Sequence, residues 1–175
     1  MRIACVLAEG FEDSEFKKPY DAFCDAGHEV VVIGKKKGEK IEGKKGKEKT
    51  KADVGIDEAR PEDYHALFIP GGHSPDMLRA EPKFVEFTKA FADRPILAIC
   101  HGPQLLMTAG MVEGRRMTAW KTVQGDLKCA GANVVDEEVV VDGNLVTSRQ
   151  PDDIPAFIER SLQLLQQGAG LHADA

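Results

Sequence analysis

The stretch Pro95-Ile-Leu-Ala-Ile-Cys-His-Gly-Pro-Gln-Leu-Leu-Met107 predicts a strand, a tight turn and a helix in direct succession. The apolar run Ile96–Ile99 is typical of a buried strand, and an apolar segment of helical character follows Pro103. Cys100 stands at the apex between them. Such a corner is a nucleophile elbow, which holds one side chain clear of the sheet and near the first N–H groups of a helix. Because the helix dipole favours a thiolate there, we expect Cys100 to be reactive.

The composition indicates one α/β domain without a polyanionic partner. The chain has 175 residues, of which 42% are hydrophobic, and this is enough for one substantial core. A formal net charge of −6 and an aromatic content of 6% argue against nucleic acid or a membrane as the main partner. No apolar run is long enough for a signal peptide or a membrane span. We expect a cytoplasmic protein with one domain over residues 1–167 and a tail over residues 168–175.

The cysteines predict neither a disulfide framework nor a zinc site, because the four of them form no C-x-x-C pair. Cys5 lies in an apolar strand, and Cys24 and Cys129 lie on helix-like segments, so we expect all three to be packing residues. Only Cys100 has a local sequence that indicates chemistry. No metal and no other cofactor is predicted.

Alternating strand and helix patterns predict a mostly parallel sheet. An apolar run at 2–8, an amphipathic segment at 14–26 and a β-branched run at 29–33 form a first βαβ unit. The remaining expected elements are strands at 50–56, 65–69, 96–99 and 117–120, a hairpin of 134–141 with 144–148, and helices at 82–92, 122–130 and 151–167.

Residues 35–51 differ sharply from the rest of the chain, with nine lysines and three glycines. A phosphate-binding loop would need glycines that open a helix directly after a strand, and this order is missing. We therefore interpret the segment as a solvated loop or hairpin, with contact to a polyanion as the alternative.

Several polar groups follow predicted strands at the same edge of the sheet as Cys100. Gly71 and Gly72 end the strand at 65–69, where glycine lets the backbone turn its N–H groups outward. The N–H groups of Gly71, Gly72 and His101 are therefore candidate oxyanion donors. Glu12 follows the first strand and can reach the same edge, or it can simply begin the next helix. His101 either partners the Cys100 thiol or only shapes the elbow.

Together these motifs resemble the PfpI subfamily of the DJ-1/PfpI superfamily over roughly residues 1–166. The resemblance rests on Gly10-Phe-Glu-Asp-Ser-Glu15, Phe68-Ile-Pro-Gly-Gly72, Ala98-Ile-Cys-His-Gly-Pro-Gln104, Val139-Val-Val-Asp-Gly-Asn144 and Thr147-Ser-Arg149. It implies a flavodoxin-like three-layer sandwich and a homodimer or homohexamer.

The resemblance also implies roles for single residues. Cys100 is then the nucleophile and His101 its partner, and Glu12 is the buried glutamate that hydrogen-bonds the cysteine sulfur. Asp76 falls where hexameric relatives offer a glutamate across the subunit interface, and it is shorter by one methylene. Trp120 occupies a pocket-wall position that is often tyrosine.

The implied activity is nucleophilic attack by Cys100 on an electrophilic carbon. We favour repair of methylglyoxal or glyoxal adducts of proteins or nucleotides over peptidase, amidase or glyoxalase activity, so small carbonyl adducts or peptides are the expected partners. The main alternative is a redox sensor or stress chaperone in which Cys100 is oxidised. A glutamine amidotransferase domain would need a distant His-x-Glu pair, whereas the chain offers His172-Ala-Asp174, with aspartate in place of the glutamate.

Overall fold

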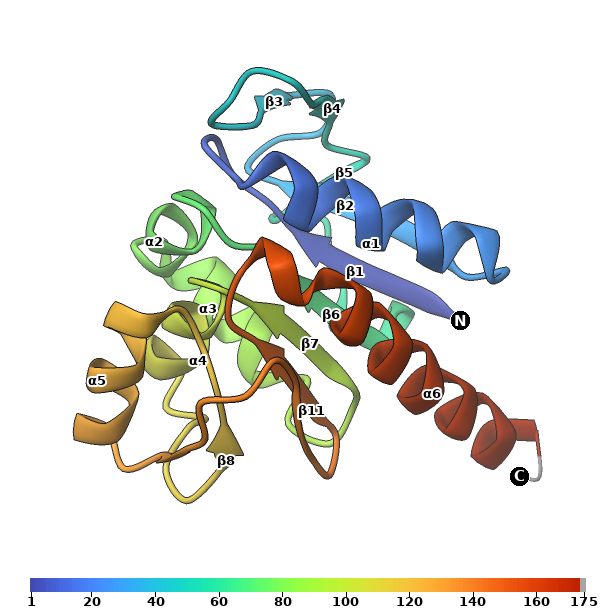
Figure 1. Ribbon diagram of the computed structural model, residues 1–175. Coiled ribbons are helices and arrows are strands. Elements are labelled where there is room, and N and C mark those ends of the chain that lie inside the picture. The colour runs from blue at the N-terminus through green and yellow to red at the C-terminus, as the bar shows by residue number, and fades with distance from the viewer. Residues whose placement is uncertain (174–175) are drawn as a thin grey trace.

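The computed structural model describes the backbone of residues 1–173 and the side chains of residues 1–167. A seven-stranded sheet with the order β10-β11-β7-β6-β1-β2-β5 runs through its centre (Figure 1). All pairings are parallel except that of β10 with β11. The strands are β1 (Arg2–Val6), β2 (Glu29–Gly34), β5 (Val54–Gly55), β6 (Ala66–Ile69), β7 (Ile96–Ile99), β10 (Val140–Asp142) and β11 (Leu145–Ser148). The inner order β2-β1-β6-β7-β11 is that of flavodoxin-like proteins.

The central strands are apolar on both faces because helices cover both sides of the sheet. In β1, Ile3 and Cys5 point to one side and Ala4 and Val6 to the other, as the two-residue period of a strand requires. All four are fully buried. The sequence therefore shows a continuous apolar run here instead of an alternating pattern.

Helices form the two outer layers of the sandwich. On one face, α1 (Asp13–Asp25) lies beside α6 (Ile154–Ala173), as Figure 1 shows. On the other face, a second apolar cluster joins the sheet to α2 (Ser74–Arg79), α3 (Pro82–Lys89), α4 (Pro103–Thr108) and α5 (Lys121–Cys129). The predicted flavodoxin-like three-layer sandwich is confirmed.

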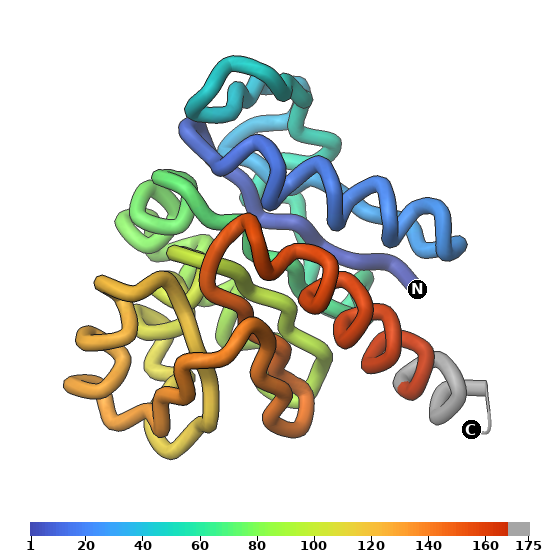
Figure 2. Tube along the Cα trace, in the orientation of Figure 1, coloured from blue at the N-terminus to red at the C-terminus, as the bar shows by residue number. Residues whose placement is uncertain are grey.

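Two small sheets and two 3-10 turns complete the described fold. β3 (Lys40–Glu42) and β4 (Lys49–Lys51) form an antiparallel hairpin, and β8 (Arg116–Met117) pairs in parallel with β9 (Asn133–Val134). The 3-10 turns are η1 (Pro61–Asp63) and η2 (Pro151–Asp153). Figure 2 shows the β3–β4 hairpin beside the loop that follows β1, and backbone hydrogen bonds from Gly10 and Lys44 join the two segments.

Three predicted boundaries are wrong. The strand expected at 134–141 is divided, because residues 133–134 pair with β8 and β10 begins only at Val140. The strand expected at 50–56 is also two pieces, which belong to different sheets. The helix expected to end at 167 continues to Ala173, so most of the expected tail is helical. Gly168 does not end α6, since a glycine costs a helix only about 1 kcal/mol.

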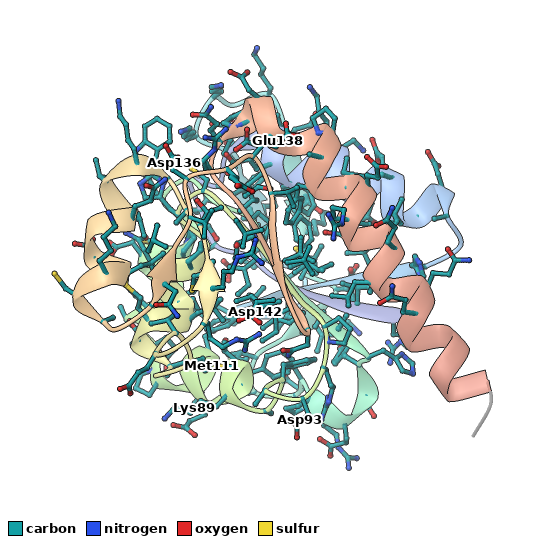
Figure 3. The ribbon with its side chains drawn as sticks, turned by 60° about the horizontal axis from the view of Figure 1, so that its bottom comes forward. Lys89, Asp93, Met111, Asp136, Glu138 and Asp142 are labelled. Atoms are coloured by element: carbon teal, nitrogen blue, oxygen red, sulfur yellow. The ribbon has the colours of Figure 1, made fainter. Side chains whose placement is uncertain are left out.

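Ion pairs fix the segments that lead into and out of the last strands. The Arg115 guanidinium donates to the Asp142 carboxylate at 3.1 Å, which ties the start of β8 to β10; Asp142 is labelled in Figure 3. Arg149 donates to both Asp136 and Asp153, so it holds the end of β11 against η2, the turn that precedes α6. Among the described helices, none combines the length and apolarity that crossing a membrane would require.

Candidate active site

Cys100 occupies a strained backbone position directly after β7. Its φ of 62° makes it the one non-glycine residue of the described chain with positive φ. The Cys100 N–H donates to Ser148 O at 2.9 Å, and its carbonyl accepts from Trp120 N–H at 3.0 Å. These bonds hold the turn from both sides, so the predicted nucleophile elbow is present.

Two glycines make room for this elbow. A Cβ on Gly71 would lie 2.8 Å from Cys100 Cβ and 2.9 Å from the carbonyl oxygen of Ile99. A Cβ on Gly102 would lie 2.6 Å from the carbonyl oxygen of Ile69. Any side chain at these positions would collide with backbone, so the turn depends on glycine for close approach and not only for flexibility.

The His101 ring faces the Cys100 thiol. Sγ and Nδ1 are 3.3 Å apart, which answers the question the sequence left open about the orientation of His101. The ring stacks on Trp120 with centroids 6.2 Å apart and an angle of 26° between the planes. Burial, followed by the charges of Lys44 and His73, lowers the pKa of His101, while Asp76 opposes this. The neutral imidazole can therefore accept the thiol proton near pH 7.

The glutamate that reaches Cys100 is Glu15, not the predicted Glu12. Glu15 is fully buried, and the Cys100 thiol and the Gly71 N–H lie close enough to interact with its carboxyl. Neither of its oxygens forms a hydrogen bond of ordinary length and angle within the described residues. The two glutamates are three residues apart at the start of α1: Glu12 is the residue before the helix, and Glu15, in its first turn, is the one that reaches the elbow.

Burial controls the protonation of the Cys100–Glu15 pair. Burial, followed by the charge of Glu12, raises the pKa of Glu15 to about 8, so this carboxyl is mainly protonated near pH 7. Burial and Glu15 also raise the pKa of the Cys100 thiol, against the effects of the His101 N–H and Lys44. The predicted lowering of the thiol pKa is therefore wrong, since α4 is a short helix whose dipole is outweighed by burial.

Glu12 instead anchors two lysines of the β3–β4 hairpin. Its carboxylate lies 3.0 Å from Lys44 Nζ and 3.1 Å from Lys45 Nζ, and Ser14 Oγ donates to it at 3.2 Å. Burial alone would raise the pKa of Glu12, but the two lysines outweigh it and lower the pKa. Glu12 lies at the predicted edge of the sheet, but its side chain pairs with two lysines and not with the Cys100 sulfur.

Asp13 fixes the turn that carries these lysines. Its carboxylate accepts three backbone N–H bonds of 2.9 Å, from Lys45, Lys47 and Glu48. A Cβ on Gly43 would lie 2.4 Å from this carboxylate, so only glycine fits beneath it. The lysine-rich segment is thus a hairpin, as expected, but its turn is docked at the candidate site instead of being wholly solvated.

The candidate oxyanion donors do not all face outward. The Gly71 N–H interacts with the Glu15 carboxyl and the His101 N–H with the Cys100 sulfur, so Gly71 is turned away from a substrate. The Gly72 N–H donates to no backbone acceptor in the described part of the chain and remains a candidate donor. Gly72 has φ of +80°, and a Cβ there would lie 2.3 Å from the Glu12 nitrogen.

The other predicted site residues lie at the rim. Asp76 is exposed on α2 and pairs with Arg79 at 2.8 Å. Trp120 is half-buried against His101 and forms one side of the site. Cys5 is buried as expected, whereas Cys24 and Cys129 are exposed and not packed. Asp174, which stands where an amidotransferase would need a glutamate, lies outside the described residues.

Other places in the described part of the chain are less well suited to nucleophilic chemistry. Within residues 1–167, no group of three His, Cys, Asp or Glu side chains has a geometry that suits a metal ion. Cavities of about 370 and 650 Å³ lie at the β3–β4 hairpin and at the opposite end of the sheet. Neither is lined by a cysteine or by a nucleophile paired with a base, so the elbow is the better candidate.

Comparison with known proteins identifies the family. Residues 1–164 match the DJ-1/PfpI family. General stress protein 18 of Bacillus subtilis strain 168 is 52% identical over 169 residues, covering 95% of this chain and 98% of that protein. Protein/nucleic acid deglycase 2 of Escherichia coli K12 is 51% identical over 167 residues, covering 94% and 97%.

Solved structures agree with the sequence comparison. A two-domain protein of Anabaena variabilis ATCC 29413, with DJ-1/ThiJ/PfpI-like and ferritin-like domains, matches with a TM-score of 0.91 and 38% identity. The match covers 97% of this chain and 49% of that one, so this chain spans about half of it. Drosophila melanogaster DJ-1β matches with a TM-score of 0.84 and 25% identity, covering 97% and 95%. With the elbow, the sheet order and these matches in agreement, the chain belongs to the DJ-1/PfpI family.

Proposed function

We propose that this protein is a cysteine hydrolase that removes methylglyoxal or glyoxal adducts from the amino groups of proteins or nucleotides. The observation that carries the proposal is the 3.3 Å contact between Cys100 Sγ and His101 Nδ1 at the strained elbow. A neutral thiol beside a neutral imidazole is suited to base-assisted attack on an electrophilic carbon. Glu15 supplies a protonated carboxyl that also interacts with the thiol.

The proposed reaction begins on the hemiaminal carbon of the adduct. His101 takes the thiol proton, Cys100 Sγ forms a bond to that carbon, and the carbon–nitrogen bond breaks. The proton passes from His101 to the leaving amine, so a free amino group and a sulfur-bound hemithioacetal result. The C–H proton then moves from the sulfur-bound carbon to the neighbouring carbonyl carbon, and the hydroxyl proton moves to the former carbonyl oxygen. The product is a thioester of the same composition. Water hydrolyses this thioester to a hydroxy acid and regenerates the thiol.

The name of a similar protein supports the hydrolytic proposal. The Escherichia coli relative carries the name protein/nucleic acid deglycase. The pKa of the Cys100 thiol does not separate the two functions, because the thiolate is the reactive form both in oxidation and in nucleophilic attack. The imidazole of His101 beside the thiol, which can act as a base, favours the enzymatic function. Peptidase, amidase and glyoxalase activities remain variants of the same attack.

Self-association is part of the proposal. Asp76 lies near enough to His101 for its charge to act on the ring, yet it is exposed on α2. The neighbouring Met77 is also 56% exposed. A second copy of the chain that packs on α2 would cover Met77 and enclose the rim of the site, as expected for a homodimer or homohexamer.

Turnover of a methylglyoxal adduct of N-acetyl-lysine tests the proposal. We expect Cys100→Ser to lose at least about a hundredfold in kcat/KM, because serine is a far weaker nucleophile beside this imidazole. Cys129→Ser, which changes an exposed cysteine, is the matched control and should retain full turnover. Full turnover by Cys100→Ser would show that the proposal is wrong. Intact-mass analysis after peroxide treatment would then test the redox alternative.

A further inference from the structure

The strained backbone of Cys100 is held by hydrogen bonds to two separate segments of the chain. Its N–H donates to Ser148 O at 2.9 Å, and its carbonyl accepts from Trp120 N–H at 3.0 Å. A left-handed conformation is unfavourable for a residue with a side chain, so it persists only where the surrounding structure fixes it. The φ of 62° at Cys100 therefore depends on how firmly these two segments are held relative to each other.

The first segment is fixed by Arg149, which follows Ser148 directly. The Ser148 carbonyl and the Arg149 N–H belong to one peptide group, and that N–H donates to the Asp153 carboxylate at 2.9 Å. The Arg149 guanidinium adds two further bonds of 3.0 and 3.1 Å to the same carboxylate, of whose side chain only 4% is exposed. The remaining Nη1 contact of 3.1 Å joins Arg149 to Asp136 Oδ1, on the connection between β9 and β10.

The second segment is tied to the same aspartate oxygen by Gln124, which lies in the first turn of α5. Gln124 Nε2 donates to Asp136 Oδ1 at 3.1 Å and to the carbonyl of Ala119 at 3.0 Å. The Ala119 carbonyl and the Trp120 N–H belong to one peptide group. Gln124 therefore holds the peptide group that donates to Cys100.

These bonds form a closed ring that begins and ends on the Cys100 backbone. Hydrogen bonds of 2.9–3.1 Å link the members that are not neighbours in the sequence. The other members, in order, are Ser148, Arg149, Asp136, Gln124, Ala119 and Trp120. A buried tie from Thr118 N–H to Thr147 Oγ1, 2.9 Å long, also joins the two segments, but it lies outside the ring. Asp136 is the exposed link, with 70% of its side chain open to solvent.

We propose that Asp136 is a positioning residue for the nucleophile, because it closes the ring that keeps Cys100 in the conformation with its sulfur 3.3 Å from His101 Nδ1. Opening the ring would let φ relax toward negative values, and the thiol would then turn away from the imidazole. Asp136 acts through Arg149 and Gln124 and not by contact with the adduct. The inference rests on the proposed function only where it assigns the attack to Cys100.

Amide hydrogen exchange measured by NMR tests the ring without relying on enzyme activity. The readouts are the exchange rates of the Cys100 and Trp120 N–H groups, and the N–H groups of β1 report global stability in the same spectra. We expect Asp136→Ala to speed exchange at both site amides about two- to tenfold relative to β1, the effect of one lost hydrogen bond on a local opening. Asp136→Asn keeps the Oδ1 acceptor and should stay within about twofold of the natural chain.

Glu138→Ala is the matched control, because it removes an exposed carboxylate from the same connection; Figure 3 labels both residues. It should leave exchange at Cys100 and Trp120 unchanged. Equal acceleration by Glu138→Ala and Asp136→Ala would overturn the inference, since the cause would then be surface charge. Unchanged exchange at Cys100 in Asp136→Ala would overturn it as well.

Gln124→Ala opens the same ring at another link, and alanine is compatible with α5. It should also speed exchange at Cys100, and the double variant Asp136→Ala/Gln124→Ala should exchange no faster than Gln124→Ala alone, because a ring that is already open cannot open again. A double variant that shows the product of the two single effects would mean that the two residues act separately, and the ring would be refuted.

Kinetics on the methylglyoxal adduct of N-acetyl-lysine then test the consequence for catalysis. We expect Asp136→Ala to lower kcat about two- to tenfold with KM within about twofold of the natural value, and Asp136→Asn to restore kcat. A raised KM with unchanged kcat would place Asp136 in substrate binding, and unchanged kinetics despite faster exchange would separate the ring from catalysis; either result overturns the inference. If the natural chain turns over no adduct while the exchange rates behave as expected, the proposed function fails and the positioning of Cys100 by Asp136 stands.

Discussion

Replacing Glu15 with glutamine tests the most unusual group of the site, a fully buried carboxyl without a strong hydrogen bond. Its pKa is raised from an ordinary value of 4.5 to about 8 in the folded chain. Between these two pKa values, the carboxyl is protonated in the folded chain and ionised in the unfolded chain. The folded state therefore loses stability as the pH rises above about 4.5, and the loss is complete near pH 8. Glutamine has nearly the same shape and does not titrate.

The magnitude follows from the linkage relation. Between about pH 5 and pH 7.5, a shift of this size lowers the free energy of unfolding of the natural chain by about 3 kcal/mol through Glu15 alone. Glu15→Gln should lack this contribution, so the stability difference between the two proteins should change by about 3 kcal/mol over the same range. At the upper end of the range, the variant should be the more stable protein.

Urea unfolding at several pH values measures the effect. Glu137→Gln, which replaces an exposed glutamate, is the control for the loss of a carboxyl group. Its stability should follow that of the natural chain across the whole range. If the stability of Glu15→Gln also ran parallel to that of the natural chain, Glu15 would not be protonated in the folded state. The proposed proton donor beside the sulfur would then be refuted.

Three further predictions concern the surroundings of the elbow. Gly71→Ala should lower stability by about 1–3 kcal/mol in urea unfolding, because its Cβ would lie 2.3 Å from an oxygen of the Glu15 carboxyl. Gly125→Ala, in an open part of α5, should be neutral or stabilising. The fluorescence of Trp120, the one tryptophan of the chain, should titrate with a midpoint below 6.5 because its stacking partner has a lowered pKa, and His101→Asn should abolish this titration. Asp13→Ala removes the acceptor of three backbone N–H bonds, so trypsin should cleave the hairpin turn at 44–49 faster than in the natural chain, and an unchanged rate would contradict the docking of that turn.

The sheet was predictable because each strand carries its own signal. Continuous apolar runs such as Ile96–Ile99 identify strands buried on both faces, and the helices between them imply parallel pairing. The short strands were predicted less well. Residues 133–134 pair with β8, which comes earlier in the chain, and not with the hairpin that follows them. No local sequence pattern indicates this pairing.

The site shows the limit of local reasoning more clearly. The edge of the sheet and the elbow follow from topology, so Cys100, His101 and Gly72 were found. The choice between Glu12 and Glu15 does not follow from topology, because the two residues are three positions apart and lie on the same face at the start of the helix. It is decided by a hairpin about thirty residues downstream, whose lysines pair with Glu12. A buried acidic position inside the amphipathic pattern of α1 was the one local signal for Glu15.

The protonation of the thiol shows why burial has to be weighed against the helix dipole. A helix N-terminus favours a nearby anion by roughly 0.3–1 kcal/mol, and α4 is only six residues long. Burial of an ionised group costs several times more. The resting site therefore keeps its protons on sulfur and on Glu15, and negative charge develops only when His101 takes the thiol proton. At that moment, the positive charge of Lys44 and the acidic proton of Glu15 act on the sulfur and offset part of the cost that burial imposes on its negative charge.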